Sequence, residues 1–132
     1  MKNRHKEYIL WLNKAKDDLK WTEANIREKI YYGACFSAQQ SAEKALKAYL
    51  VFKKGRFGKI HDLVSLLGHC SRINKNFTLF KKKVAKISRY YIQSRYPDIG
   101  DLDMFTEKEA SEAFEIAEEV VSFIGDQIVD NT

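Results

Sequence analysis

The sequence predicts an all-α protein, an antiparallel up-and-down bundle of four long helices plus one short helix. Apolar residues recur at three- and four-residue intervals along most of the chain, which is the period of an amphipathic helix. The chain has one proline and six glycines, whereas an all-β sandwich needs many more turn residues. With 132 residues, 45% of them hydrophobic, it is long enough to bury one core. We therefore expect a single domain over residues 1–132.

The first two helices are expected over about 4–28 and 32–54. The apolar stripe of the first is formed by Tyr8, Trp11, Leu12, Ala15, Leu19 and Ile26. The stripe of the second is built mainly from small residues: Cys35, Ala38, Ala42, Ala45, Tyr49 and Phe52. Because small side chains let neighbouring helices approach closely, we place the second helix at the centre of the bundle. Its cysteine is interpreted as a core residue rather than a reactive thiol.

A loop and a short helix follow. Gly55 and Gly58 lie three residues apart, and two such glycines make a continuing helix costly. Asp62 is a suitable N-cap for a short helix. The apolar residues of that helix are Leu63, Leu66 and Leu67.

The fourth segment and the last helix are separated by the only proline. The fourth helix is expected from about Phe77 to Arg95, because Pro97 disfavours helical geometry in the residue before it. Thr106 followed three residues later by Glu109 has the form of a capping box, which opens the last helix.

The net charge of +5 is unevenly distributed. Residues 44–95 contain fourteen Lys or Arg and one acid, whereas residues 96–132 contain eleven acids and one Lys. In one interpretation, the acidic last helix packs beside the basic fourth helix and the charges pair at the surface. In the other, a basic strip with interleaved tyrosines faces phosphates and stacks on bases. That strip would comprise Lys81, Lys82, Lys83, Lys86, Arg89 and Arg95, with Tyr90, Tyr91 and Tyr96.

Several classes of protein and site are not indicated. No apolar run approaches the ~18 residues of a membrane span, and the charged N-terminus is not followed by an apolar signal segment. We therefore expect a cytoplasmic protein without a membrane association. The three histidines give no pair at zinc-binding spacing, and the glycines form no phosphate-binding loop. No metal and no cofactor is predicted.

Three stretches together resemble the HEPN domain family, small helical bundles found in prokaryotes and often encoded with minimal nucleotidyltransferases. The first is Ala-Cys-Phe-Ser-Ala-Gln-Gln-Ser-Ala-Glu-Lys-Ala-Leu-Lys-Ala at 34–48. The second is His-Asp-Leu at 61–63, and the third is the segment 89–98, which ends in Arg-Tyr-Pro-Asp. Their order and spacing match the family along most of the chain.

The resemblance implies a homodimer that binds a nucleotide or RNA and is the partner of a minimal nucleotidyltransferase in a toxin–antitoxin-type pair. Arg and Lys side chains would contact phosphate, and Tyr would stack. The ligand-binding residues that it indicates are Gln40, Lys44, Lys47, His61, Arg89, Arg95, Tyr96 and Asp98.

The residues themselves leave alternatives open at each of these places. Gln40, Lys44 and Lys47 lie on one helical face, but they could equally form a solvated margin of the core. His61 could be an ordinary surface histidine beside a capping aspartate. The Arg-Tyr-Pro-Asp segment could be a helix stop in which the aspartate pairs with the arginine.

Many HEPN proteins are metal-independent ribonucleases with an Arg, four to six residues, then a His. Counting from Arg89, those spacings lead to Ser, Arg and Tyr, so the motif is absent from the late helix. Arg56 and His61 match the spacing formally, but they span the glycine loop, and we interpret the match as coincidental. Two alternatives remain: an endoribonuclease toxin that uses Arg56 or Arg89 with His61 as proton carrier, and a structural antitoxin that only masks a partner.

Overall fold

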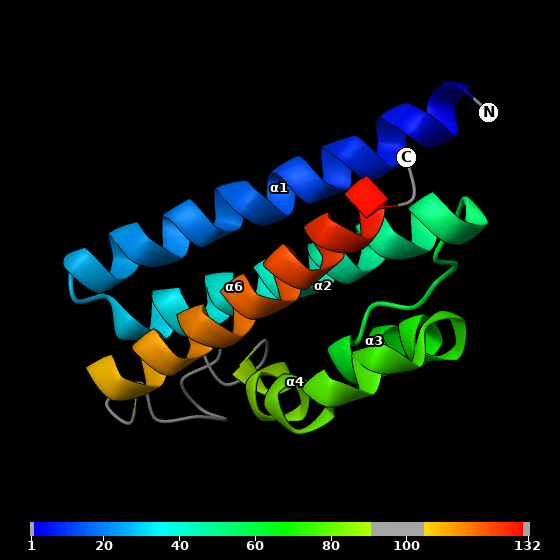
Figure 1. Ribbon diagram of the computed structural model, residues 1–132. Coiled ribbons are helices and arrows are strands. Elements are labelled where there is room, and N and C mark those ends of the chain that lie inside the picture. The colour runs from blue at the N-terminus through cyan, green and yellow to red at the C-terminus, as the bar shows by residue number, and fades with distance from the viewer. Residues whose placement is uncertain (1, 91–104, 131–132) are drawn as a thin grey trace.

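The computed structural model describes residues 2–90 and 105–130, and it confirms the all-α fold class (Figure 1). Within those residues there is no β-strand. The helical elements in chain order are α1 (Lys2–Arg27), α2 (Tyr31–Lys54), α3 (Leu63–Ile73), the 3₁₀ helix η1 (Lys75–Phe80), α4 (Lys81–Ser88) and α6 (Glu107–Asp130).

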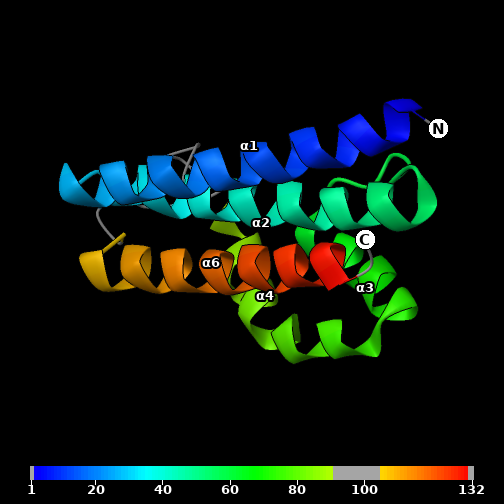
Figure 2. The same ribbon diagram turned by 45° about the horizontal axis from the view of Figure 1, so that its top comes forward.

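The three longest helices lie side by side, with α1 antiparallel to α2 and α6 running in the same direction as α2 (Figures 1 and 2). These are the directions that the first, second and last members of an up-and-down bundle must have. The elements α3, η1 and α4 form a bent arm against α2 and α6, and α4 runs antiparallel to α6. The arm therefore brings the chain back so that α6 can start at the same end as α2.

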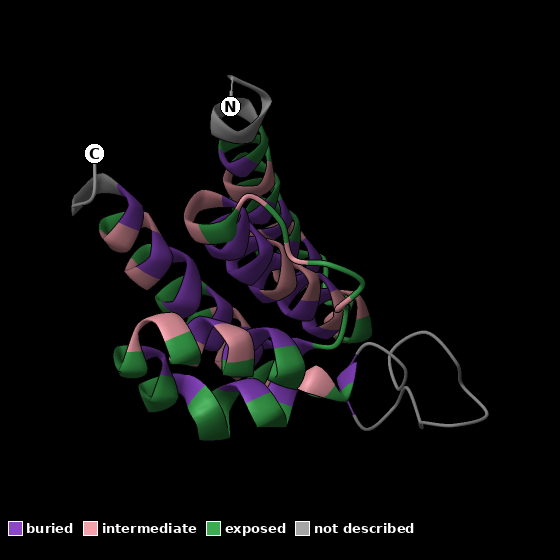
Figure 3. Cartoon of the chain, turned by 90° about the vertical axis from the view of Figure 1, so that its right-hand side faces the viewer, coloured by how far each residue is buried: buried purple, intermediate pink, exposed green. Residues whose placement is uncertain are grey.

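Helix α2 is the centre of the bundle, as its small residues predicted, and it contacts α1, α3, α4 and α6. Ala38, Ala42 and Ala45 are completely buried, which allows neighbouring helices to approach closely. Cys35 is also completely buried, and burial raises the pKa of its thiol to about 12. Buried residues line the inner faces of the helices, while exposed residues cover the outer face of the arm (Figure 3).

The fourth predicted helix is divided into two elements in the described part of the chain. Its first turns form η1, and α4 then extends through Ser88; the predicted end near Arg95 lies outside the described residues. In a 3₁₀ helix, side chains three residues apart lie on the same side. Phe77 and Phe80 have that spacing, and both rings pack against Phe123 of α6. The 3₁₀ geometry thus directs both rings into the core.

Two predicted helix caps are present, one of them in part. The Asp62 carboxylate accepts a hydrogen bond from the Ser65 amide at 2.9 Å, which is the N-cap of α3. The Thr106 hydroxyl accepts one from the Glu109 amide at 3.2 Å. The Glu109 carboxylate accepts a hydrogen bond from the Tyr90 hydroxyl at 3.4 Å rather than from the Thr106 amide, so the capping box is not completed. That bond links the end of α4 to the start of α6.

The acidic last helix lies beside the basic fourth helix. The Lys83 ammonium is 2.7 Å from the Glu119 carboxylate, and Lys86 pairs with Glu112. The surface-pairing interpretation of the charges is therefore confirmed for these two lysines. All four side chains are more than 40% exposed, so each pair contributes only about 0–1 kcal/mol to folding stability.

Candidate functional site

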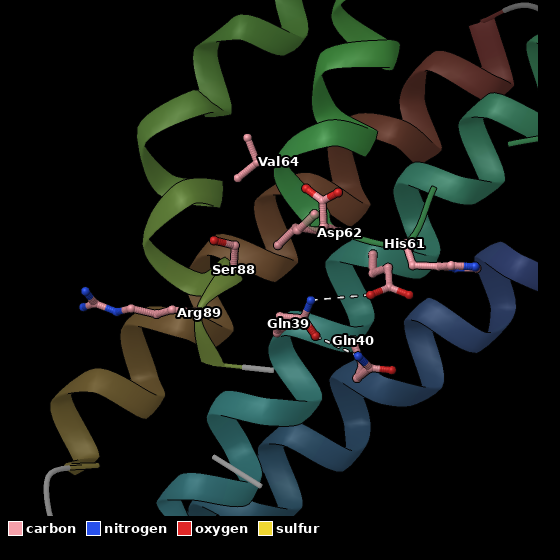
Figure 4. A pocket seen from close by; sticks show the side chains of 9 residues that line it. Gln39, Gln40, His61, Asp62, Val64, Ser88 and Arg89 are labelled. Carbon is pink, nitrogen blue, oxygen red and sulfur yellow. Dashed lines mark hydrogen bonds between the residues drawn. The ribbon is translucent and has the colours of Figure 1, made fainter. Parts of the chain in front are cut away.

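A pocket of about 490 Å³ lies between α2, the start of α3 and the end of α4 (Figure 4). Its wall combines amides, carboxylates, a hydroxyl, an arginine and two aliphatic side chains. The lining residues are Gln39, Gln40, Glu43, His61, Asp62, Leu63, Val64, Ser88 and Arg89. A pocket that mixes apolar surface with a few polar groups is typical of a small-molecule or nucleotide site.

A chain of hydrogen bonds forms the α2 side of the pocket. The Gln40 amide nitrogen donates to the Gln39 carbonyl oxygen at 2.7 Å, and the Gln39 amide nitrogen donates to Glu43 Oε1 at 3.5 Å (Figure 4). The Lys47 ammonium donates to Glu43 Oε2 at 2.9 Å and lies 3.2 Å from Nδ1 of His61. We call these five residues the relay. Hydrogen bonds in such a chain support one another and fix the side chains in one arrangement.

Lys47 is the buried member of the relay, with a residue exposure of 5%. Its ammonium lies 5.2 Å from the centre of the Trp11 ring and 4.9 Å from that of the Phe57 ring. The two rings meet edge to face. Glu43 and the aromatic faces together compensate the charge of a lysine that is removed from water.

The charged groups of the pocket are arranged so that Arg89 is the exposed cation. Glu43 is neutralised by Lys47. The Asp62 carboxylate caps α3, and its hydrogen bonds to Ser65 lower the pKa of that carboxyl, so it stays ionised at neutral pH. An anionic ligand group is therefore favoured near Arg89 and disfavoured near Asp62.

Arg89 and His61 line the same pocket but do not face each other. In Figure 4 the Arg89 side chain and the His61 ring point to opposite sides. The chemistry of a single catalytic centre would need both groups within reach of one phosphate. In the arrangement of this structure the two groups suit a ligand that crosses the pocket.

The structure brings together three of the residues indicated by the sequence: Gln40, His61 and Arg89. Lys44, although it is on the same helix, points to α1, where its ammonium is 2.7 Å from the Asp18 carboxylate. Lys47 lies behind the pocket wall, in the relay.

Of the remaining indicated residues, only Arg56 lies in the described part of the chain. Arg56 is exposed in the loop after α2 and is not a lining residue. Arg95, Tyr96 and Asp98 lie outside the described residues.

The pocket also contains residues outside the ligand-binding set that the sequence indicated. Gln39 is only 2% exposed although it is polar. Val64 is 46% exposed although it is apolar. Because Val64 lies off the apolar stripe of α3, the sequence could have predicted an apolar side chain at the surface there. Ser88 offered no such signal, because its place in the wall depends on where α4 ends.

Among residues 7–90 and 105–128, whose side chains the structure describes, no cluster of three His, Cys, Asp or Glu side chains could hold a metal ion. None of the helices in the same part of the chain is long and apolar enough to cross a membrane.

Comparison with known proteins identifies similar sequences and structures. The sequence model of the HEPN domain matches residues 8–127. The crystal structure of TT1696 from Thermus thermophilus is 27% identical with a TM-score of 0.79, over 90% of this chain and 96% of that one. The crystal structure of ST0689, described as an archaeal HEPN homologue, is 28% identical with a TM-score of 0.76, over 92% and 97% of the two chains. No significant match was found among proteins with curated descriptions.

Proposed function

Because the chain belongs to the HEPN domain family, we propose that it binds a nucleotide or single-stranded RNA in the pocket between α2, α3 and α4. The observation that carries this proposal is the composition of the pocket wall. Arg89 supplies a cation for phosphate, Gln40 supplies an amide for a base edge, and Val64 supplies exposed apolar surface for a base face.

The opposed directions of Arg89 and His61 favour RNA over an isolated nucleotide. A strand that crosses the pocket can place one phosphate near Arg89 and a neighbouring one near His61, with a base between them over the glutamines. A mononucleotide can use only one of these two groups for a phosphate. Electrostatic contacts on both sides of a base-binding surface are typical of proteins that bind single strands.

The proposal is a binding function rather than catalysis. The Arg-x4–6-His spacing is absent after Arg89, and His61 points away from Arg89. Cleavage of the RNA in the binding experiment below would favour the ribonuclease alternative instead.

The proposal includes a homodimer and a minimal nucleotidyltransferase as the partner, in a toxin–antitoxin-type pair; both come from the family resemblance. Exposed aromatic side chains near the α1–α2 turn support an interface, since Trp21 is 51% and Tyr32 is 43% exposed. Light scattering on the purified protein measures its molar mass in solution and so tests whether it is a homodimer. Co-purification with the product of a neighbouring nucleotidyltransferase gene tests the partner. Failure to co-purify would contradict the proposed partner and also the alternative role of masking such a partner.

The binding proposal is tested by fluorescence anisotropy with a labelled single-stranded RNA, and with AMP as competitor, in the presence of EDTA. Arg89→Ala is expected to weaken RNA binding about tenfold, the effect of losing one charge-assisted hydrogen bond. It should also reduce the slope of the logarithm of the affinity against the logarithm of the salt concentration by about one, which corresponds to the loss of one phosphate contact. The matched control is Arg72→Ala, an exposed arginine of α3 that does not line the pocket. Equal losses in both variants, or no binding by the unmodified protein, would overturn the proposal.

A further inference from the structure

Lys47 is a charged residue behind the wall of the pocket, where it cannot reach a ligand directly. It is 5% exposed, it is enclosed by the rings of Trp11 and Phe57, and its ammonium is used by Glu43 and His61. A lysine in such a place acts on the pocket only through the groups that it contacts.

The hydrogen bonds on the glutamine side of Lys47 have a fixed direction. A lysine ammonium only donates and an ionised carboxylate only accepts. Glu43 therefore also accepts from Gln39, which must turn its NH₂ group toward the carboxylate and its carbonyl oxygen toward Gln40. Gln40 must in turn direct its own NH₂ group at Gln39. Neither amide can flip without placing two acceptors or two donors face to face.

The carbonyl oxygen of Gln40 is the last acceptor on the glutamine side of the relay. It lies on the part of the side chain that points away from Gln39 (Figure 4). No donor among residues 7–90 and 105–128, whose side chains the structure describes, contacts it. The relay therefore offers a ligand an acceptor at Gln40.

The direction on the histidine side is fixed in the same way. Because the Lys47 ammonium is a donor, Nδ1 of His61 must accept, and the proton of the neutral ring is then on Nε2. His61 is exposed, so its Nε2–H is a donor that a ligand can reach.

We propose that Lys47 and Glu43 are positioning residues that together set the hydrogen-bonding pattern of the pocket: Glu43 directs the glutamine amides so that Gln40 Oε1 is an acceptor, and Lys47 directs His61 so that Nε2 is a donor. The matching ligand carries an amino group, such as the exocyclic amine of a base, and an acceptor such as a phosphate oxygen. This inference rests on the proposed function for its ligand, but the state of the relay can be measured without any ligand.

The first experiment determines the tautomer of His61 by ¹⁵N NMR of the ring nitrogens, at a pH where the ring is neutral. The unmodified protein is expected to carry the proton on Nε2. Lys47→Met should give a mixture of the two tautomers, because Nδ1 loses its donor. Lys54→Met is the matched control: it removes one exposed positive charge from the same helix and should leave the tautomer unchanged.

Lys47→Arg, which restores a cationic donor, should return the ring toward the Nε2–H form. A proton on Nδ1 in the unmodified protein overturns the proposal, even if Lys47→Met does not fold. Retention of the Nε2–H form in a folded Lys47→Met variant overturns it too.

The second experiment measures binding of the labelled RNA to the same variants. Lys47→Met is expected to bind about tenfold more weakly, the effect of one lost or misdirected hydrogen bond to a charged group, with Lys54→Met close to the unmodified protein. If the unmodified protein binds no RNA, the proposed function fails while the tautomer result still decides the role of Lys47. If RNA binds and Lys47→Met binds it equally well with an altered tautomer, the positioning role fails while the proposed function stands.

Discussion

Replacement of Lys44 separates a structural role from the ligand-binding role that the family resemblance implies. In the structure its ammonium is 2.7 Å from the Asp18 carboxylate, and the two side chains are 24% and 12% exposed. Removing one partner of an exposed pair costs about 0–1 kcal/mol, and of a fully buried pair about 3–5 kcal/mol. The intermediate exposure indicates a loss of about 2 kcal/mol in the free energy of unfolding for Lys44→Met.

That loss corresponds to a measurable change in the melting temperature. An unfolding entropy of about 2.1 cal/mol/K per residue gives about 0.28 kcal/mol/K for this chain, so the expected decrease in Tm is about 7 °C. Circular dichroism measures it, and the double variant Asp18→Asn/Lys44→Met should lose less than the sum of the two single variants. RNA affinity should remain that of the Lys54→Met control. An unchanged Tm together with a tenfold loss of RNA affinity would refute the structural assignment and return Lys44 to the site.

Three further predictions concern the helix cap, the thiols and the core. Asp62→Ala should lower the free energy of unfolding by about 1 kcal/mol, because it removes the cap of α3. Since folding lowers the pKa of Asp62, this stabilisation is present above the unfolded pKa and is lost as the pH falls through the lower folded pKa. Measuring the Tm of both proteins as a function of pH in the acid range tests this. Burial raises the thiol pKa values of Cys35 and Cys70 to about 12. Neither thiol should therefore react with a disulfide reagent at pH 8 until denaturant is added. Rapid reaction of the native protein would contradict their burial. Phe77→Ala, which removes a completely buried ring packed against two others, should cost about 3–5 kcal/mol in urea denaturation, and a loss below 1 kcal/mol would contradict the packing.

Much of the fold could be predicted because local signals and tertiary packing agree. The alanines of α2 indicated a central helix, Asp62 indicated the start of α3, and the positive φ of 80° at Gly55 explains why α2 ends there. The 3₁₀ geometry of η1 could not be predicted, because it depends on Phe77 and Phe80 both packing against a residue of α6.

The site was harder to predict than the fold, since a helical face does not determine which neighbour each side chain meets. Gln40, Lys44 and Lys47 share a face of α2, and yet only Gln40 lines the pocket. Lys44 meets a carboxylate of α1, and Lys47 meets His61 from the following loop. Those partners come from other elements, so the spacing along α2 carries no information about them.

The central claim is that the glutamine face of α2 is where the ligand lies. The most direct test is a titration of the ¹⁵N-labelled protein with the single-stranded RNA, followed through the side-chain amide signals. The side-chain amides of Gln39 and Gln40 are expected to shift, while that of Asn74, which is bonded to Gln127 and lies outside the pocket, should not. Shifts that leave both glutamines unchanged would place any ligand elsewhere and contradict the account.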